Sequence, residues 1–337
     1  MIRHLTFATH SCTDLPNART PLVSVICLCY NQAPYLREAL NSVLAQTYSA
    51  WELIIVNDAS TDNSVAVIQD FLKAHPIKEF ISLPNNLGNC RAFNQGLARA
   101  GGKYVIDLAA DDVMLPDRME EQVAAFESLG DGYGVVYTNA MRIDAHSREL
   151  GLYYPDARSR AGLPQGDVYA EVLKRSFICP PTMMMRKKVL DELGGYDESL
   201  NYEDFDFWVR SSRNHSYAYL DKVLTARREV STSHSRRFID RKSASTLKVC
   251  EKASGLNRNS DEGKALVSRI EYHLRQAFFM ELFDQVESYA QLMYTIGSPN
   301  WITRLIVHAS RRHVSISVLY KAYLKYRFGF EFYDEPT

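Results

Sequence analysis

The stretch LVSVICLCYNQAPYLREALNSVLAQTYSAWELIIVND (residues 22–58) decides the fold class of this 337-residue chain. Its first part, 22–30, is apolar and rich in β-branched residues, which predicts a buried parallel strand. Pro34 suits the start of a helix over 35–47, in which apolar residues recur at helical spacing (Leu36, Leu40, Val43 and Leu44). The apolar run 51–58 predicts a second strand, so the stretch is typical of a strand–helix–strand unit.

The same alternation continues to about residue 129. The pattern predicts strands over 80–84 and 103–110, and helices over 64–74, 90–100 and 116–129. Strands that alternate with helices indicate an α/β fold, with a mostly parallel sheet covered by helices on both faces. Such sheets bind ligands at the carboxyl ends of their strands.

The pattern loosens after a further strand at 134–144. Residues 145–166 predict a long loop, 178–200 an extended segment with a short helix and a Gly-Gly turn, 203–214 a helix, and 216–230 a strand pair. From about residue 240 onward the pattern is helical. We therefore divide the chain into a leader at 1–20, an α/β domain at 21–235 and a helical C-terminal region at 236–337.

Acidic side chains recur at four places along this pattern: Asp58, Asp111 with Asp112, Asp156, and Glu203 with Asp204. The first two places follow predicted strands, and Glu203 and Asp204 begin a predicted helix, where the helix dipole favours anions. Carboxylates so placed can hold a nucleotide, a divalent cation and a sugar hydroxyl. Asp156 lies in the predicted loop without a partner, so we leave it out of the candidate site.

Each place also has a purely structural explanation. Asp58 can form an Asx turn with Asp62 capping the next helix, Asp111 and Asp112 can form a capping turn, and Glu203 with Asp204 can satisfy a helix dipole. Three such sites at suitable spacing on one α/β pattern favour a binding function over three unrelated caps.

The sequence argues against several other classes of protein. A net charge of -1 gives no overall field that would attract nucleic acid. No GxGxxG follows the first strand, which argues against a dinucleotide oxidoreductase. ARAGGKY (98–104) is not a phosphate-binding P-loop, because Leu97 and Tyr104 stand where that motif needs Gly and Ser or Thr.

Cysteine usage and hydropathy predict a cytoplasmic protein. The six cysteines form no CxxC pair, and buried reduced thiols fit the cytosol. The first sixteen residues lack the apolar core of a secretory signal, and no stretch of 18 apolar residues without charge predicts a membrane span.

Three segments of the chain resemble the family 2 glycosyltransferases, which have the Rossmann-like GT-A (nucleotide-diphospho-sugar transferase) fold. They are VSVICLCYNQAPYLREALNSVLAQTYSAWELIIVNDASTDNS, NNLGNCRAFNQGLARAGGKYVIDLAADDVMLPDRM and GGYDESLNYEDFDFWVR, in the order that the family has them. The resemblance covers about residues 22–230.

The resemblance implies a role for each residue of the candidate site. Tyr30 would lie against the nucleobase of the donor, and Asp58 would accept a hydrogen bond from the base, commonly uracil. Asp111 and Asp112 would meet the ribose and a divalent cation, Mn²⁺ or Mg²⁺, which suits carboxylate and phosphate oxygens. Tyr30 as an ordinary core residue remains the alternative.

The third segment would carry the chemistry. Asp204 would be the general base that takes the proton of an acceptor hydroxyl during a single displacement, which inverts the anomeric centre. Glu203 would orient its neighbours.

Two positions depart from the family pattern. Ala109 stands where the family often has an Asp, and Glu229 stands where a His is expected, with His234 nearby as an alternative metal ligand. No QxxRW motif and no membrane helix accompany the pattern, which favours a transferase that adds one sugar over a processive synthase.

The C-terminal region contains the segment 301–330, which is basic, aromatic and free of acidic residues. An ordinary solvated helix face is one explanation, and peripheral association with the inner face of an anionic membrane is the other hypothesis.

These observations predict a metal-dependent, inverting glycosyltransferase that moves one sugar from a nucleotide-sugar donor, commonly a UDP-sugar, to a hydroxyl on a glycan or lipid-linked acceptor. Bacterial cell-surface polysaccharide or lipopolysaccharide biosynthesis is the setting that the resemblance implies. A non-catalytic GT-A-like protein that binds nucleotide sugar or glycan, or acts as a scaffold, is the alternative from another class.

Overall fold

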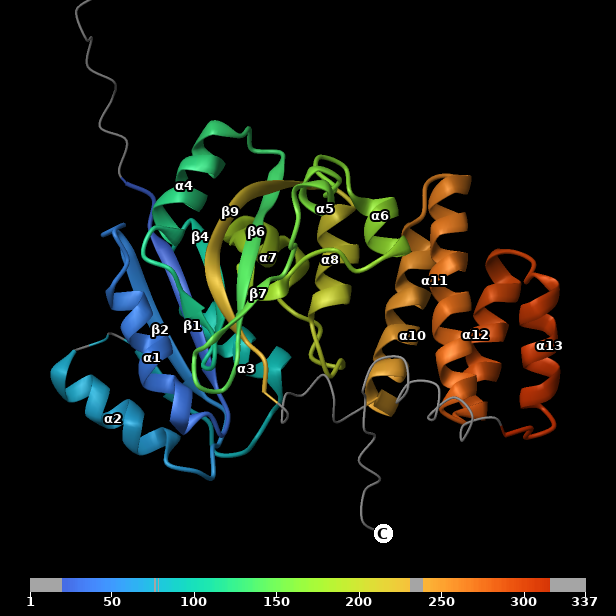
Figure 1. The fold of residues 1–337 in the computed structure, drawn as a ribbon, viewed down its shortest axis with the longest axis horizontal. Helices are drawn as coiled ribbons and strands as arrows, with labels where there is room; N and C mark the ends of the chain where they lie inside the picture. The colour runs from blue at the N-terminus through green and yellow to red at the C-terminus, as the bar shows by residue number, and fades with distance from the viewer. Residues whose placement is uncertain (1–19, 76, 78, 231–238, 316–337) are drawn as a thin grey trace, which may run out of the picture.

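The computed structural model of the protein describes residues 20–75, 77, 79–230 and 239–315. A twisted sheet lies at the centre of its amino-terminal part, and helices cover both faces of the sheet (Figure 1). The predicted α/β fold is thereby confirmed.

The sheet contains nine strands within the described residues, and eight of them follow the order β3-β2-β1-β4-β8-β6-β9-β5, with β7 paired to β6. The strands are β1 (Val23–Cys29), β2 (Trp51–Asn57), β3 (Glu79–Ser82), β4 (Tyr104–Ala109), β5 (Val113–Met114), β6 (Tyr133–Ile143), β7 (Glu149–Leu152), β8 (Met184–Arg186) and β9 (Ser216–Arg228). The four strands β1 to β4 run parallel, while β8 runs antiparallel between β4 and β6. The expected mostly parallel sheet is therefore present, with β8 as a short antiparallel strand in its interior and β5 and β7 as antiparallel strands beside β9 and β6.

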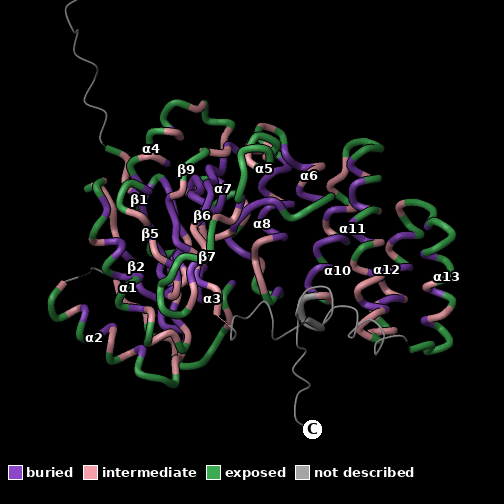
Figure 2. Tube along the Cα trace, viewed as in Figure 1, coloured by how far each residue is buried: buried purple, intermediate pink, exposed green. Residues whose placement is uncertain are grey.

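Alternate side chains of the central strands enter two separate cores. Val25, Cys27 and Ile55 face a cluster that includes residues of α1 (Ala33–Leu44), α2 (Ser64–Ala74) and α4 (Arg118–Ser128). Ile26 and Val56 face the other cluster, to which α3 (Asn89–Leu97), α6 (Tyr169–Lys174) and α8 (Asp204–Ser212) contribute. Burial on both faces explains why these strands read as continuous apolar runs, and Figure 2 shows buried residues along the central strands.

The C-terminal helices extend the second core. They are α10 (Ile239–Leu256), α11 (Ser260–Phe279), α12 (Phe283–Ile296) and α13 (Trp301–Ser310), and they stack side by side away from the sheet (Figure 1). Val249, Leu266 and Ile270 belong to the same buried cluster as Ile26 of the sheet. The helical C-terminal region is thus confirmed, whereas its predicted boundary at 235/236 lies outside the described residues and stays a prediction.

A tight turn separates α11 from α12, in which Glu281 has φ +60° and the Leu282 N–H donates to the Ala277 carbonyl at 2.9 Å. Two local expectations differ from the structure. The segment 216–230 forms one long strand, because β9 pairs in parallel along the whole of β6. The loop 145–166 contains β7 and the short helix α5 (Ala157–Ala161), which Asp156 caps through a 2.8 Å bond from the Ser159 N–H.

The remaining short elements lie between β7 and α8. They are the 3₁₀ turn η1 (Pro180–Thr182) and α7 (Lys187–Leu193), which ends at Gly194 and Gly195, both with positive φ. This matches the extended segment, short helix and Gly-Gly turn expected over 178–200. No helix of the described residues is long and apolar enough to span a membrane.

Candidate active site

The carboxyl ends of β1, β2 and β4 bring the first acidic residues of the sequence together. The Asp58 N–H donates to the Cys29 carbonyl at 2.9 Å, and the Ala110 N–H donates to the Leu28 carbonyl at 3.0 Å. The loops after β1 and β2 are also joined, because Asn31 Oδ1 accepts from the Thr61 N–H at 2.7 Å. The predicted meeting of strand ends at one edge of the sheet is therefore present.

Asp58 holds a neighbouring loop against this edge. Its two carboxylate oxygens accept from the backbone N–H groups of Leu87 and Gly88 at 2.7 and 2.9 Å. The local turn instead uses Asp62, whose Oδ1 accepts from the Ser64 N–H at 2.9 Å. Since an ionised carboxylate offers about four acceptor positions, Asp58 retains capacity for a ligand.

Tyr30 follows β1 directly and is only partly buried. It therefore lies at the rim of the strand ends rather than deep in the core. Its contact with a nucleobase stays a prediction.

Asp111 and Asp112 have different surroundings. Asp112 is buried, and its Oδ1 accepts from the Arg228 N–H at 2.8 Å, which ties the end of β4 to the end of β9. Burial, together with the neighbouring Asp111, raises the pKa of Asp112 to about 8. Burial also raises the pKa of Asp111, although a hydrogen bond from the Gln32 side chain opposes this.

The strand ends also contain an unpaired acceptor. The buried Oε1 of Gln32 has no hydrogen-bond partner within the described part of the chain, and its side chain lies beside Asp111. A carboxylate and an amide oxygen are hard ligands that suit Mg²⁺ or Mn²⁺, and Mg²⁺ commonly takes only one or two carboxylates plus substrate phosphates. These residues fit a cation whose remaining ligands come from the phosphates of the substrate.

The protein does not supply a complete metal cage among the residues that the structure describes. Over those residues no group of three or more His, Cys, Asp and Glu side chains is arranged to hold a metal. His234, the predicted alternative ligand, lies outside them. Glu229, at the position expected for a His, accepts from Arg142 at 2.8 and 3.0 Å.

Glu203 and Asp204 stand at the start of α8, as the sequence predicts. Glu203 occupies the cap position and makes no side-chain capping bond. Its Oε2 instead accepts from Asn89 Nδ2 at 2.6 Å. Burial raises the pKa of Glu203, while hydrogen bonds with Asn89 and with the Asp204 side chain oppose that rise.

Two further charged residues near these carboxylates were not predicted. Asp107, in the middle of β4, accepts from the Tyr196 hydroxyl at 3.2 Å, and burial followed by the charge of Glu203 raises its pKa. A lone acidic residue within the apolar run KYVIDLAA is a signal that could have revealed it.

Arg227 is the second unpredicted residue, and it supplies positive charge. Its guanidinium lies 5.6 Å from the centre of the Tyr153 ring. Burial raises the pKa of Cys179, Arg227 lowers it, and Asp112 and Asp204 raise it further, so these groups share one neighbourhood. Alternation along β9 directs Arg227 to the face opposite Arg228, which only a correct strand assignment would have shown.

Comparison with known proteins agrees with this geometry. The sequence profile described as Glycosyl transferase family 2 matches residues 24–194. The chain therefore belongs to glycosyl transferase family 2. It is 34% identical to the uncharacterized glycosyltransferase RP339 of Rickettsia prowazekii, over 62% of this chain and 64% of that protein. It is also 34% identical to EpsE of Bacillus subtilis, over 64% of this chain and 76% of that protein.

Solved structures share the fold at lower identity. S. aureus TarS 1-349 in complex with UDP has a TM-score of 0.66 and 16% identity, with 93% of each chain covered. The Pyrobaculum calidifontis mannosyltransferase PcManGT in complex with GDP-Man and Mn²⁺ has a TM-score of 0.54 and 17% identity, over 93% of this chain and 89% of that chain. These likenesses confirm the GT-A fold.

Proposed function

We propose that the protein transfers a single sugar from a nucleoside-diphosphate donor to a hydroxyl group of an acceptor, with inversion at the anomeric carbon. The observation that carries this proposal is the carboxylate pair at the start of α8. Glu203 is engaged by Asn89 across the site rather than by its own helix, and Asp204 lies beside it. Membership of family 2 supports the same reading.

Asp204 is the proposed base. Its carboxylate takes the proton of the acceptor hydroxyl as that oxygen forms a bond to the anomeric carbon. In the same step the bond from that carbon to the diphosphate oxygen breaks, and the nucleoside diphosphate leaves with the bonding electrons. Positioned proton transfer of this kind contributes roughly 10²–10⁴-fold to a rate.

The strand ends form the proposed donor site. Tyr30 and Asp58 would hold the nucleobase, while Asp111 with Gln32 would hold the ribose and a divalent cation. Such a cation supplies Lewis-acid neutralisation of the diphosphate. Arg227 would add positive charge near the same carboxylates. TarS has been solved with UDP and UDP-GlcNAc, and PcManGT with GDP-Man, which supports a nucleotide-sugar donor. Of the two nucleotides we propose UDP.

The acceptor is proposed to be a glycan or lipid-linked molecule of a bacterial cell-surface polysaccharide, handled at the cytoplasmic face of a membrane. An exposed apolar face on α13 supports this setting. Trp301, Ile302 and Leu305 are 70%, 45% and 58% exposed, and Arg304 and Arg312 lie on or just after the same helix. The rest of the predicted basic segment, 316–330, lies outside the described residues.

A panel of nucleotide sugars, scored by donor hydrolysis with Mn²⁺ or Mg²⁺, tests the proposal without knowledge of the acceptor. We expect hydrolysis of one donor class, at a rate that falls in the Asp204→Asn variant. Binding of UDP without turnover of any donor would instead favour a non-catalytic nucleotide-sugar-binding protein. Ala109, which stands where the family often has an Asp, is the reason to test this alternative.

A further inference from the structure

One face of α10 contacts the loop that leads to the catalytic carboxylates. Positions 245, 248 and 252 are three and four residues apart, so their side chains lie on one side of the helix. Their partners all belong to the loop 194–203: Ser245 Oγ accepts from the Asn201 N–H at 3.3 Å, Lys248 Nζ donates to the Ser199 carbonyl at 3.4 Å, and Lys252 forms an ion pair with Asp197. The C-terminal region therefore contacts this loop along its length.

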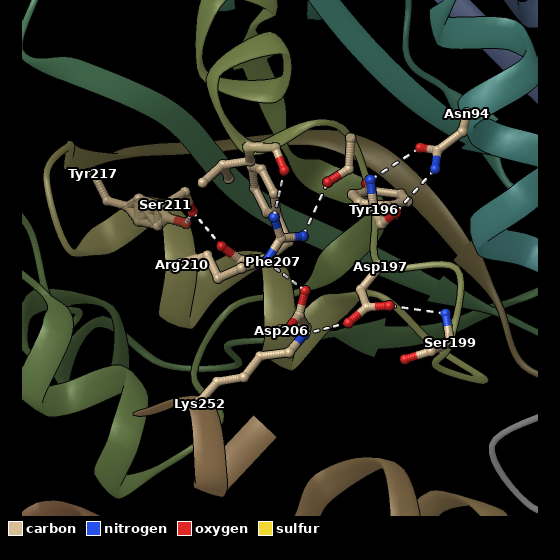
Figure 3. A network of polar contacts seen from close by, with 12 residues as sticks. Asn94, Tyr196, Asp197, Ser199, Asp206, Phe207, Arg210, Ser211, Tyr217 and Lys252 are labelled. Atoms are coloured by element: carbon tan, nitrogen blue, oxygen red, sulfur yellow. Dashed lines mark hydrogen bonds and ion pairs between the residues drawn. The ribbon is translucent and has the colours of Figure 1, made fainter. Parts of the chain in front are cut away.

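Lys252 also reaches the helix that carries the proposed base. Its Nζ lies 2.5 Å from Asp206 Oδ1, two positions beyond Asp204 on α8. The Asp206 side of this contact is shielded from solvent, because Asp206 is only 1% exposed. Figure 3 shows the Lys252 ammonium between Asp197 and Asp206.

Arg210 contacts the second carboxylate oxygen of Asp206. Its Nε donates to Asp206 Oδ2 at 2.6 Å, while its two terminal nitrogens donate to the carbonyls of Leu193 and Gly195 at 2.9 Å each. The start of the loop is thus fixed to α8 by Arg210, and its middle is fixed to α8 by Lys252. Two cations and two carboxylates balance one another in this cluster (Figure 3).

We propose that Lys252 is a positioning residue for the glycosyl transfer: it holds the loop 194–203 against the start of α8 and so orients Glu203 and Asp204. The inference rests on the proposed function. The family profile ends at residue 194, so this contact comes from a part of the chain that the family match does not include. The C-terminal helices then help to position the proposed catalytic carboxylates.

The surrounding contacts separate this role from simple support of the fold. Without Lys252, Asp206 keeps Arg210, and α8 keeps a second anchor in the 2.8 Å ion pair between Arg213 and Glu262 of α11. Asp197 would retain the 2.8 Å bond from the Ser199 N–H within its own loop. The loop loses its ionic connection to the helix, while the helix itself stays attached.

Lys252→Met tests the inference, with Lys252→Arg as the conservative variant. Lys264→Met is the matched control, because it removes an exposed Lys–Asp pair of the same region on α11. We expect kcat to fall roughly 10–100-fold in Lys252→Met, since small displacements of catalytic groups cost about that much. The Kd for UDP should stay within about twofold, and Lys252→Arg should recover most of kcat because an arginine can bridge two carboxylates.

A double variant tests whether Lys252 acts through Asp197. If Lys252 acts through Asp197, Lys252→Met combined with Asp197→Asn should lose little more kcat than either change alone. A kcat for Lys252→Met equal to that of wild type would overturn the inference.

Hydrogen exchange distinguishes this inference from failure of the proposed function. Exchange of the backbone amides over 194–207 should quicken in Lys252→Met, while amides of β1 and β4 stay as protected as in wild type. Should the wild-type protein hydrolyse no donor, the proposed function fails and this exchange measurement still decides whether Lys252 holds the loop. Unchanged exchange over 194–207 refutes the role of Lys252.

Discussion

Asn89 and Glu203, 114 residues apart in the sequence, are joined by a 2.6 Å hydrogen bond from Nδ2 to Oε2. Asn89 follows Gly88, whose N–H is held by Asp58 at the end of β2. One short segment of backbone therefore connects the carboxylate proposed for the nucleobase with the carboxylate beside the proposed base. The two sides of the proposed substrate site are therefore connected through the backbone of Gly88 and Asn89.

Asn89→Ala should alter the pH dependence of transfer. The Asn89 hydrogen bond holds down the pKa of Glu203 against burial, and Asp107 and Asp204 are the acidic groups that face it. Without this bond the pKa of Glu203 rises, so the acidic limb of the kcat profile should move to higher pH. A pH profile of transfer measures this, and an unmoved acidic limb would show that Glu203 does not govern it.

Asp204→Asn should reduce transfer by roughly 10²–10⁴-fold, because the amide cannot accept the acceptor's proton. Binding of UDP, measured by calorimetry, should change by less than about threefold. Asp70→Asn is a suitable control, since Asp70 pairs with Lys73 on the exposed face of α2. Full activity of Asp204→Asn would exclude it as the base.

Asp111→Asn should weaken Mn²⁺-dependent binding of UDP by about tenfold or more, because it removes the carboxylate beside the unpaired Gln32 oxygen. Calorimetry with and without Mn²⁺ separates this effect on the metal from binding of the nucleobase. Equal affinity of variant and wild type under both conditions would remove Asp111 from the metal and ribose site.

Asp112→Ala should mainly reduce stability. It leaves the buried Arg228 N–H without its acceptor, and a loss of this kind typically costs about 1–3 kcal/mol. Thermal or denaturant unfolding measures the change, and Asp112→Asn, which keeps an acceptor oxygen, should lose less. A metal ligand without a structural role would show the reverse: normal unfolding with lost metal dependence.

The exposed face of α13 should bind anionic membranes. Vesicles that contain phosphatidylglycerol should recruit the protein in a flotation assay, more weakly at high salt. Trp301→Ser together with Leu305→Ser should abolish recruitment without a change in UDP binding. Absence of recruitment at low salt contradicts the proposed membrane setting.

The fold was largely predictable because strands buried on both faces read as apolar runs between amphipathic helices. The parallel order of β1, β2 and β4 then brought Asp58 and Asp111 to one edge by geometry alone. β8 was harder to place: its three residues pair antiparallel between β4 and β6, and no local pattern specifies such long-range neighbours.

The candidate site was predictable where carboxylates lie next to strand ends and not where they depend on distant contacts. Lys252 has no distinguishing sequence feature, because it is one lysine among several on an ordinary helix. Its importance arises only once α10 packs on α8. Asp111 and Asp112 looked equivalent in sequence, and long-range contacts distinguish them: the Arg228 N–H donates to Asp112, while the Gln32 side chain lies beside Asp111.

The buried cluster that runs from Ile26 in the sheet to Ile270 in α11 limits how this protein can be recombined with others. An exchange of the C-terminal helices for those of another transferase would uncover the apolar sides of α6 and α8, on which α10 and α11 pack, unless the new helices reproduced the same contacts. We therefore expect the α/β part and the C-terminal helices of this protein to have evolved together. Changes in acceptor preference would then arise through loops rather than through exchange of whole segments.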